Sequence, residues 1–102
     1  MFICNHCPYV KAVEDRILEL NREFHPQGIQ FVGICANDPS DYPEDSPAKL
    51  FQRWKEKNYD FPYLFDESQQ TARDYGAVCT PDLYVFDSAQ RLFYHGRIDD
   101  NW

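Results

Sequence analysis

The chain contains one strong helical pattern of hydrophobic positions, which begins just after Pro8. Apolar residues recur at intervals of 3, 4, 3 and 4 residues, at Val10, Val13, Ile17, Leu20 and Phe24. The positions between them carry polar and charged side chains, including Glu14, Asp15, Arg16, Glu19, Asn21 and Arg22. This spacing places the apolar residues on one face of an amphipathic α-helix. Pro8 suits the first helical turn, and Pro26 with Gly28 ends the helix.

Short apolar runs before and after this helix predict β-strands. Residues 1–3 form the end of a buried strand, and residues 29–36 (IQFVGICA) suit a parallel strand that is covered on both faces. Strand, helix and strand then form a right-handed βαβ unit. Two further apolar runs, at 83–86 and 92–94, are separated by a loop of ordinary length and predict an antiparallel hairpin.

The middle of the chain predicts two more helices. A helix start is favoured at Ser46 and Pro47, and the helix runs to about residue 57. Its inward-facing apolar side chains are expected to be Leu50, Phe51 and Trp54. An extended segment follows at 61–65, and a short helix at 67–75 is closed by Gly76, which accepts a left-handed backbone. The expected order is β-α-β-α-(β)-α-β-β, an α/β sandwich.

Composition and charge exclude several classes of protein. The chain has 102 residues, the size of one domain, and 10 Lys and Arg against 17 Asp and Glu give a net charge of −7. No basic surface is available for nucleic acid or an anionic membrane, and no apolar run approaches the ~20 residues that span a bilayer. The acidic stretch Asp38–Asp45 is interpreted as a solvated loop. No signal peptide precedes the first cysteine, so the cytosol is the default compartment.

The residues with the clearest chemical meaning are Cys4-Asn5-His6-Cys7-Pro8, between the first strand and the helix start. We expect the Cys4 sulfur to lie at the helix N-terminus, where unpaired N–H groups and the helix dipole stabilise a thiolate and lower the pKa. Cys7 would lie one turn further along and resolve the mixed disulfide. Cys4 and Cys7 are therefore predicted to be catalytic, with Asn5, His6 and Pro8 modulating them.

Two alternatives concern His6 and the cysteine pair. A partly protonated His6 beside the Cys4 sulfur would stabilise the thiolate and raise the reduction potential of the couple; the alternative is that His6 is a solvated loop residue. The pair is also half of a structural zinc site, but a complete site needs two more ligands. No second CxxC or HxxxH is present, and Cys35, inside a strand, is interpreted as core. We therefore predict no metal and no cofactor.

Several motifs along the chain give it a family resemblance. They are residues 2–10 (FICNHCPYV), Asn37-Asp38, residues 61–66 (FPYLFD), 75–82 (YGAVCTPD) and 96–100 (GRIDD). On these motifs the chain resembles thioredoxin-fold proteins of the alkyl hydroperoxide reductase and thiol-specific antioxidant (peroxiredoxin-like) branch. The resemblance implies a thioredoxin-like three-layer sandwich with a mixed sheet and a C-terminal antiparallel hairpin. Family members carry more chain at both ends, so residues 1–102 are expected to be a single domain that is truncated at both ends.

The resemblance also implies a second part of the site. It implies that Thr80-Pro81 is a cis peptide facing the dithiol, where an extended substrate could pair as an added strand. The alternative is an ordinary trans proline at a strand start. Cys79 would then lie close to Cys4 and Cys7, either as a third redox participant or, as we favour, as a buried apolar residue.

The chain departs from its relatives at two points. Peroxiredoxins carry a Thr or Ser three residues before the reactive cysteine, and here Cys4 occupies that place relative to Cys7. This departure weakens the prediction of a peroxidase. Thioredoxins carry a buried acid on the strand that enters the dithiol, and nothing before Cys4 can serve. Proton transfer must then use water, His6 or a residue that is absent.

The leading functional prediction is a thiol–disulfide oxidoreductase that acts on a protein or small-molecule disulfide and is recycled by an unidentified thiol reductant. One alternative is thiol-dependent peroxide reduction through a sulfenic acid. Another is a copper- or zinc-binding module that uses Cys4 and Cys7, with or without His6. A third is an inert fragment that folds poorly.

Overall fold

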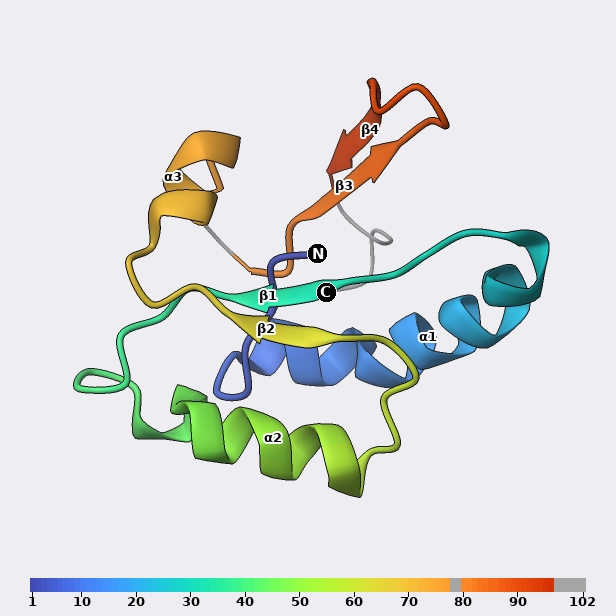
Figure 1. The fold of residues 1–102 in the computed structure, drawn as a ribbon. Coiled ribbons are helices and arrows are strands. Elements are labelled where there is room, and N and C mark those ends of the chain that lie inside the picture. Colours follow the sequence, from blue (N-terminus) through green and yellow to red (C-terminus); the bar gives the residue numbers. More distant parts are fainter. Residues whose placement is uncertain (78–79, 97–102) are drawn as a thin grey trace.

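The computed structural model describes residues 1–77 and 80–96, and it contains three α-helices and four short strands within these ranges. In chain order they are α1 (Pro8–Phe24), β1 (Gly33–Cys35), α2 (Pro47–Glu56), β2 (Tyr63–Phe65), α3 (Gln70–Tyr75), β3 (Leu83–Phe86) and β4 (Leu92–Gly96). Two 3-10 turns, η1 (His25–Gln27) and η2 (Pro43–Asp45), precede β1 and α2. In the view of Figure 1, α1 and α2 lie below β1 and β2, and α3 and the β3–β4 hairpin lie above them.

The strands form two small sheets that meet at Phe2. β1 pairs with β2 in parallel, and β3 pairs with β4 in antiparallel fashion. Phe2 forms a parallel bridge to Ile34 on one side and an antiparallel bridge to Asp82 on the other. The result is a small mixed α/β fold that is compatible with a truncated thioredoxin-like domain, and the hairpin expected at the C-terminal end is present. The single continuous mixed sheet that was expected is replaced by two sheets, because only one residue of the first segment bridges to both.

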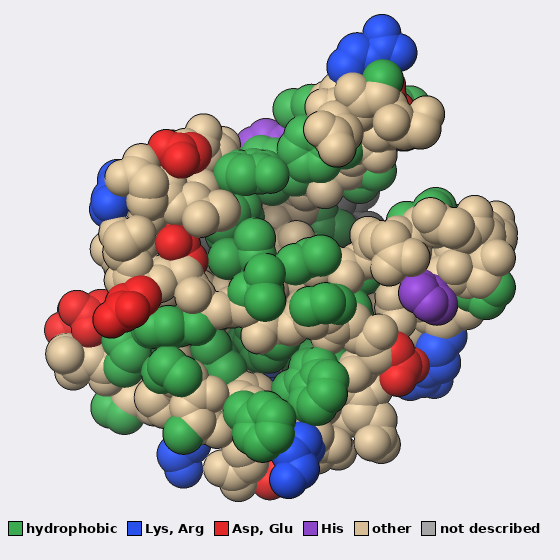
Figure 2. Space-filling model, viewed as in Figure 1, with side chains coloured by type: hydrophobic (Ala, Val, Ile, Leu, Met, Phe, Trp, Pro, Cys, Tyr) green, Lys and Arg blue, Asp and Glu red, His purple; other side chains and the backbone are tan. Residues whose placement is uncertain are grey.

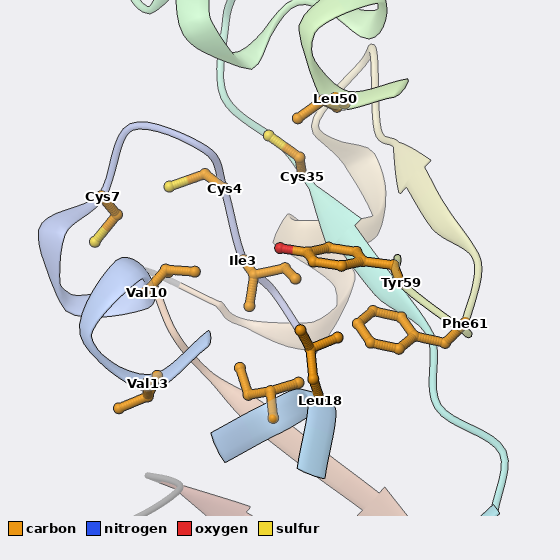
Figure 3. Close-up of a cluster of buried hydrophobic side chains, with 11 residues drawn as sticks. Ile3, Cys4, Cys7, Val10, Val13, Leu18, Cys35, Leu50, Tyr59 and Phe61 are labelled. Carbon is orange, nitrogen blue, oxygen red and sulfur yellow. The ribbon is translucent and has the colours of Figure 1, made fainter. Parts of the chain in front are cut away.

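The hydrophobic core of the described residues lies between α1, α2 and the β1–β2 sheet. Both cysteines of the CxxC motif belong to this core, as Figure 3 shows. The buried core side chains are Ile3, Cys4, Cys7, Val10, Val13, Ile17, Leu18, Cys35, Leu50, Tyr59 and Phe61. The dithiol is therefore built into the packed interior. Cys35 is fully buried, which confirms its interpretation as a core residue.

The helix predicted from the hydrophobic pattern is confirmed as α1, but its buried face is wider than the pattern indicated. Leu18, Glu14 and Asn21 are buried, although the last two were assigned to the solvated face. Glu14 is accommodated because Arg53 Nη2 lies 2.7 Å from one of its oxygens and the Tyr59 hydroxyl donates to the other at 2.6 Å. Burial raises the pKa of Glu14, but the hydrogen bonds from Arg53 and Tyr59 outweigh it and leave the pKa below its ordinary value.

Two other expectations about packing are wrong. The strand expected over 29–36 is reduced to β1, and Val32 in the segment before it is exposed. In α2, Leu50 is buried as expected, but Phe51 is 59% exposed and stacks on Trp54 at the surface. Hydrophobic side chains gather on the face shown in Figure 2, over β1, β2 and α2. No helix among the described residues is long and apolar enough to cross a membrane.

Candidate redox site

The CxxC motif forms a tight loop that leads directly into α1. Pro8 is the first residue of the helix, as the sequence predicted, and Cys7 is its N-cap residue. Cys4 therefore lies before the helix rather than at its N-terminus, which corrects the expected placement of both cysteines. The reason is that Pro8 fixes the start of the helix, so the cap position falls on the second cysteine. The unpaired backbone N–H groups of the first helical turn therefore lie next to Cys7 and not next to Cys4.

The two sulfurs converge on Thr80, which is 73 or more residues away in the sequence. The Cys4 Sγ lies 3.5 Å from the Thr80 Oγ1, and the Cys7 Sγ donates to the Thr80 carbonyl oxygen at 3.6 Å. The Thr80–Pro81 peptide bond is cis, as the family resemblance implied, and this excludes the trans alternative. Both cysteines are free thiols in this structure.

The Cys4 thiol is deeply buried and hard to ionise. Its exposed fraction is 3%, against 8% for Cys7. Burial, together with the negative charge of Asp45, raises the pKa of Cys4 to about 11, although hydrogen bonds from Thr80 and from the Cys7 backbone act in the opposite direction. The sequence predicted a lowered pKa for Cys4, and this prediction is wrong because it placed the sulfur at the helix N-terminus. Cys4 needs a base to lose its proton at neutral pH.

Asp45 is a part of the site that sequence reasoning missed. The acidic stretch that contains it was interpreted as a solvated loop, but its side chain is fully buried. One carboxylate oxygen accepts the backbone N–H groups of Asn5 at 2.6 Å and His6 at 3.1 Å. The other contacts the His6 Nδ1 and accepts from the Asn37 side-chain amide at 2.9 Å. No local sequence signal separates Asp45 from its acidic neighbours, because its partners come from distant segments.

His6 is held in one orientation beside the cysteine. Its ring is stacked on Tyr42 with the ring centres 4.2 Å apart, and its Nδ1 faces the Asp45 carboxylate. A ring nitrogen of His6, a carboxylate oxygen of Asp45 and the Cys4 Sγ all lie within 4.8 Å of one another. His6 therefore belongs to the site, and its interpretation as a freely solvated loop residue is wrong. The arrangement places an imidazole, in contact with a buried carboxylate, beside the Cys4 sulfur.

Asn5 fixes the loop that carries the cysteines. Its side-chain amide donates to the backbone carbonyls of Glu44 and Lys49, both at 2.9 Å. Its carbonyl oxygen accepts the Tyr63 hydroxyl at 3.3 Å. These contacts tie the loop to η2, to the start of α2 and to β2, and the modulating role of Asn5 stays a prediction.

The group formed by Cys4, His6 and Asp45 has donor types that suit a transition metal. Both oxygens of Asp45 already accept hydrogen bonds, from two backbone N–H groups and two side chains. A metal ion bound by this carboxylate would have to displace some of them. The donor set fits a proton-transfer site better than a metal site.

The remaining cysteines take different positions. Burial raises the pKa of Cys35 to about 12, which suits a packing role. Cys79 lies outside the described residues, so its expected proximity to the dithiol stays a prediction.

Comparison with known proteins assigns the family. The AhpC/TSA family model matches residues 1–95. A crystal structure of an uncharacterized conserved protein from Geobacillus kaustophilus is 48% identical, with a TM-score of 0.97 over 99% of this chain and 53% of that one. A hypothetical protein from Sinorhizobium meliloti 1021 is 39% identical, with a TM-score of 0.96 over 99% of this chain and 55% of that one.

This chain thus spans about half the length of both solved structures. No curated protein matches it. The family match extends over the dithiol loop, the Asp45 carboxylate and the Thr80 turn, in a family whose members are usually thiol-dependent oxidoreductases. The chain belongs to the AhpC/TSA family, the peroxiredoxin-like branch of the thioredoxin fold.

Proposed function

We propose that this chain is a thiol–disulfide oxidoreductase that cycles Cys4 and Cys7 between a dithiol and a disulfide. The observation that carries the proposal is the convergence of both sulfurs on Thr80, at 3.5 and 3.6 Å. A substrate sulfur that approaches this turn would meet both cysteines. We further propose that the described fold is part of a thioredoxin-like sandwich, and that an external thiol recycles the disulfide.

We assign the first attack to Cys7, which reverses the order expected from the sequence. Cys7 is the N-cap residue of α1, next to the unpaired N–H groups of the first helical turn, and it is less deeply buried than Cys4, with 8% against 3% exposed. The Cys7 thiolate attacks a substrate disulfide RSSR, which forms a mixed disulfide and releases RS⁻. Cys4 then loses its proton and attacks Cys7, releasing the second RS⁻. The two protons of the dithiol end on two molecules of RSH, and the enzyme disulfide remains.

His6 and Asp45 serve the second step. Cys4 must lose a proton although burial raises its pKa to about 11. His6 lies beside it, and Asp45 orients the imidazole through Nδ1. We propose that His6 accepts the Cys4 proton and that Asp45 is a positioning residue. This fills the role for which no acid was found before Cys4 in the sequence.

Single-cysteine variants test both the function and the order of attack. The reduced protein is mixed with 2-hydroxyethyl disulfide, quenched with acid and digested, and the Met1–Lys11 peptide is analysed by mass spectrometry. Cys4→Ser should trap a stable mixed disulfide on Cys7, and Cys7→Ser should react much more slowly. Equal trapping on either cysteine would refute the order, and no reaction in the wild-type chain would refute the function.

Peroxide reduction is the second candidate, and the family match favours it. In this reaction a Cys7 thiolate would attack ROOH, forming a sulfenic acid and releasing ROH after protonation. Cys4 would then condense with the sulfenic acid and release water. Consumption of hydrogen peroxide by the reduced protein, compared with its oxidation by a disulfide, separates the two reactions. The metal-binding alternative rests on the Cys4–His6–Asp45 group, and metal analysis of protein purified without chelator decides it.

A further inference from the structure

A pocket of about 320 Å³ is lined by Thr80, which contacts both cysteine sulfurs, and by His6 of the dithiol loop, although neither cysteine lines it. It opens between the CxxC loop, the end of β1 and the start of α3. Its lining includes Phe2, His6 and Thr80, and Thr80 is the residue on which both cysteine sulfurs converge. A cavity of this size can hold a small molecule rather than a folded protein segment. Through Thr80 it lies next to both cysteine sulfurs.

The charge of this pocket differs from that of the rest of the chain. The chain has a net charge of −7, yet none of the described residues that line the pocket is acidic. Two other cavities of the chain have acidic side chains in their lining, Asp66 and Glu67 in one case and Asp38 and Glu67 in the other. The pocket beside the dithiol instead contains Arg73, together with His6. Asp45 is buried behind His6 and does not line it.

Arg73 retains hydrogen-bonding capacity for a ligand. Its Nη2 donates to the Ser68 carbonyl at 2.8 Å and to the Gln70 side chain at 3.4 Å, and both partners are uncharged. Among the described residues no carboxylate forms an ion pair with it. A guanidinium carries five N–H donors in a planar fork that matches a carboxylate. The side-chain amide of Asn37, which also lines the pocket, adds a neutral polar group.

We propose that this pocket binds small disulfides that carry a carboxylate, with Arg73 as the residue that selects them. The proposal rests on the dithiol function proposed above and names its substrate class. The sulfur–sulfur bond of the substrate would face Thr80 and the cysteines, and the carboxylate would face Arg73. The reaction is the balanced exchange already described, in which RSSR accepts two electrons and two protons and yields two RSH.

The proposal is tested by oxidising the reduced protein with each of three disulfides that differ in charge. They are 3,3′-dithiodipropionate, which is anionic, 2-hydroxyethyl disulfide, which is neutral, and cystamine, which is cationic. The rate constant for oxidation of the Met1–Lys11 peptide is measured with each. The wild-type chain should react with the anionic disulfide about 3- to 10-fold faster than with the neutral one. The lower figure corresponds to an exposed ion pair between Arg73 and the substrate carboxylate, and the higher figure to a bidentate pair.

Variants of Arg73 show whether the preference arises in this pocket. Arg73→Gln should abolish the preference by slowing the reaction with the anionic disulfide, and Arg73→Glu should favour cystamine. Arg91→Gln removes the same charge from an exposed arginine that pairs with Asp87 in the hairpin, and it should keep the wild-type preference. Added salt should reduce the preference of the wild-type chain. Circular dichroism checks that each variant is folded.

The outcomes separate this proposal from the function on which it rests. If the neutral disulfide oxidises Cys4 and Cys7 but all three disulfides react alike, or if Arg73→Gln keeps the anionic preference, the pocket assignment is overturned and the function stands. If no disulfide oxidises the pair, both are overturned.

Discussion

The replacement Asp45→Asn gives the clearest prediction, because it should lower the pKa of Cys4 and yet slow the step in which Cys4 loses its proton and attacks the mixed disulfide. Asp45 raises the pKa of Cys4 through its charge, and it also orients His6, which we propose as the proton acceptor. Burial is the main cause of the raised value of about 11, against an ordinary 9.0, and Asp45 supplies a smaller part; the whole shift corresponds to about 100-fold less thiolate at neutral pH. Removal of the charge should therefore lower the pKa of Cys4 and increase its equilibrium reactivity.

The rate of the second step should nevertheless fall. A positioned general base contributes roughly 10²–10⁴-fold to a rate. The larger thiolate fraction of Cys4 in the variant offsets only part of the loss of an oriented His6. We expect Asp45→Asn to slow the conversion of mixed disulfide to enzyme disulfide on the order of tenfold, so that the mixed disulfide accumulates. The first step, attack by Cys7, should change much less.

Two measurements on the same variant check this prediction. Iodoacetamide labelling of Cys4 as a function of pH, in a Cys7→Ser background, gives the thiol pKa. Quenched-flow mass spectrometry gives the lifetime of the mixed disulfide. Asp41→Asn, which removes an exposed charge from the same loop, is the matched control and should leave both unchanged. If Asp45→Asn resolves the mixed disulfide as fast as the wild-type chain or faster, Asp45 acts through its charge alone and the positioning role is refuted.

The remaining predictions concern the core. Glu14→Gln should lower the free energy of unfolding by about 2 kcal/mol. This is less than the ~3–5 kcal/mol for a fully buried ion pair, because the cationic partners of Glu14 are partly exposed. The control Glu19→Gln should change the free energy of unfolding little. Since the pKa of Glu14 in the folded chain lies below its ordinary value of 4.5, its stabilisation is present above that pH and is lost as the pH falls further, which urea unfolding at several pH values measures. Leu50→Ala should cost about 2–5 kcal/mol and Phe51→Ala less than about 1 kcal/mol, because only the first is buried, and the same unfolding assay compares them. Cys35→Ala should leave the rate of dithiol oxidation unchanged, and a large change in that rate would place Cys35 in the redox chemistry.

The sequence predicted those elements whose signals are local. The spacing of apolar residues behind Pro8 gave α1, and Gly76 closed α3 with a left-handed backbone, at a φ of 72°. The two runs of the hairpin became β3 and β4. Each of these features depends on residues within a few positions of one another, so a pattern in the chain is sufficient to find them.

The errors fall where the environment comes from distant segments. Asp45 looks like its exposed acidic neighbours, but its four donors come from the CxxC loop and from Asn37. Glu14 was placed on the solvated face because the arginine that neutralises it lies 39 residues further along the chain. The placement of Cys4 was wrong for a different reason. Pro8 fixes the start of the helix and puts the cap on Cys7, and the sequence argument overlooked this local signal when it gave the cap position to Cys4.

The most direct test of the central claim is to incubate the chain in glutathione buffers of graded redox ratio and to analyse the alkylated Met1–Lys11 peptide by mass spectrometry. The account predicts a reversible bridge between Cys4 and Cys7 that forms in a single transition as the buffer becomes more oxidising. The potential at the midpoint shows whether the couple resembles a reductase, at about −270 mV, or an oxidase, at about −120 mV. A peptide in which the two sulfurs never bridge at any ratio, although the chain is folded, would contradict the account.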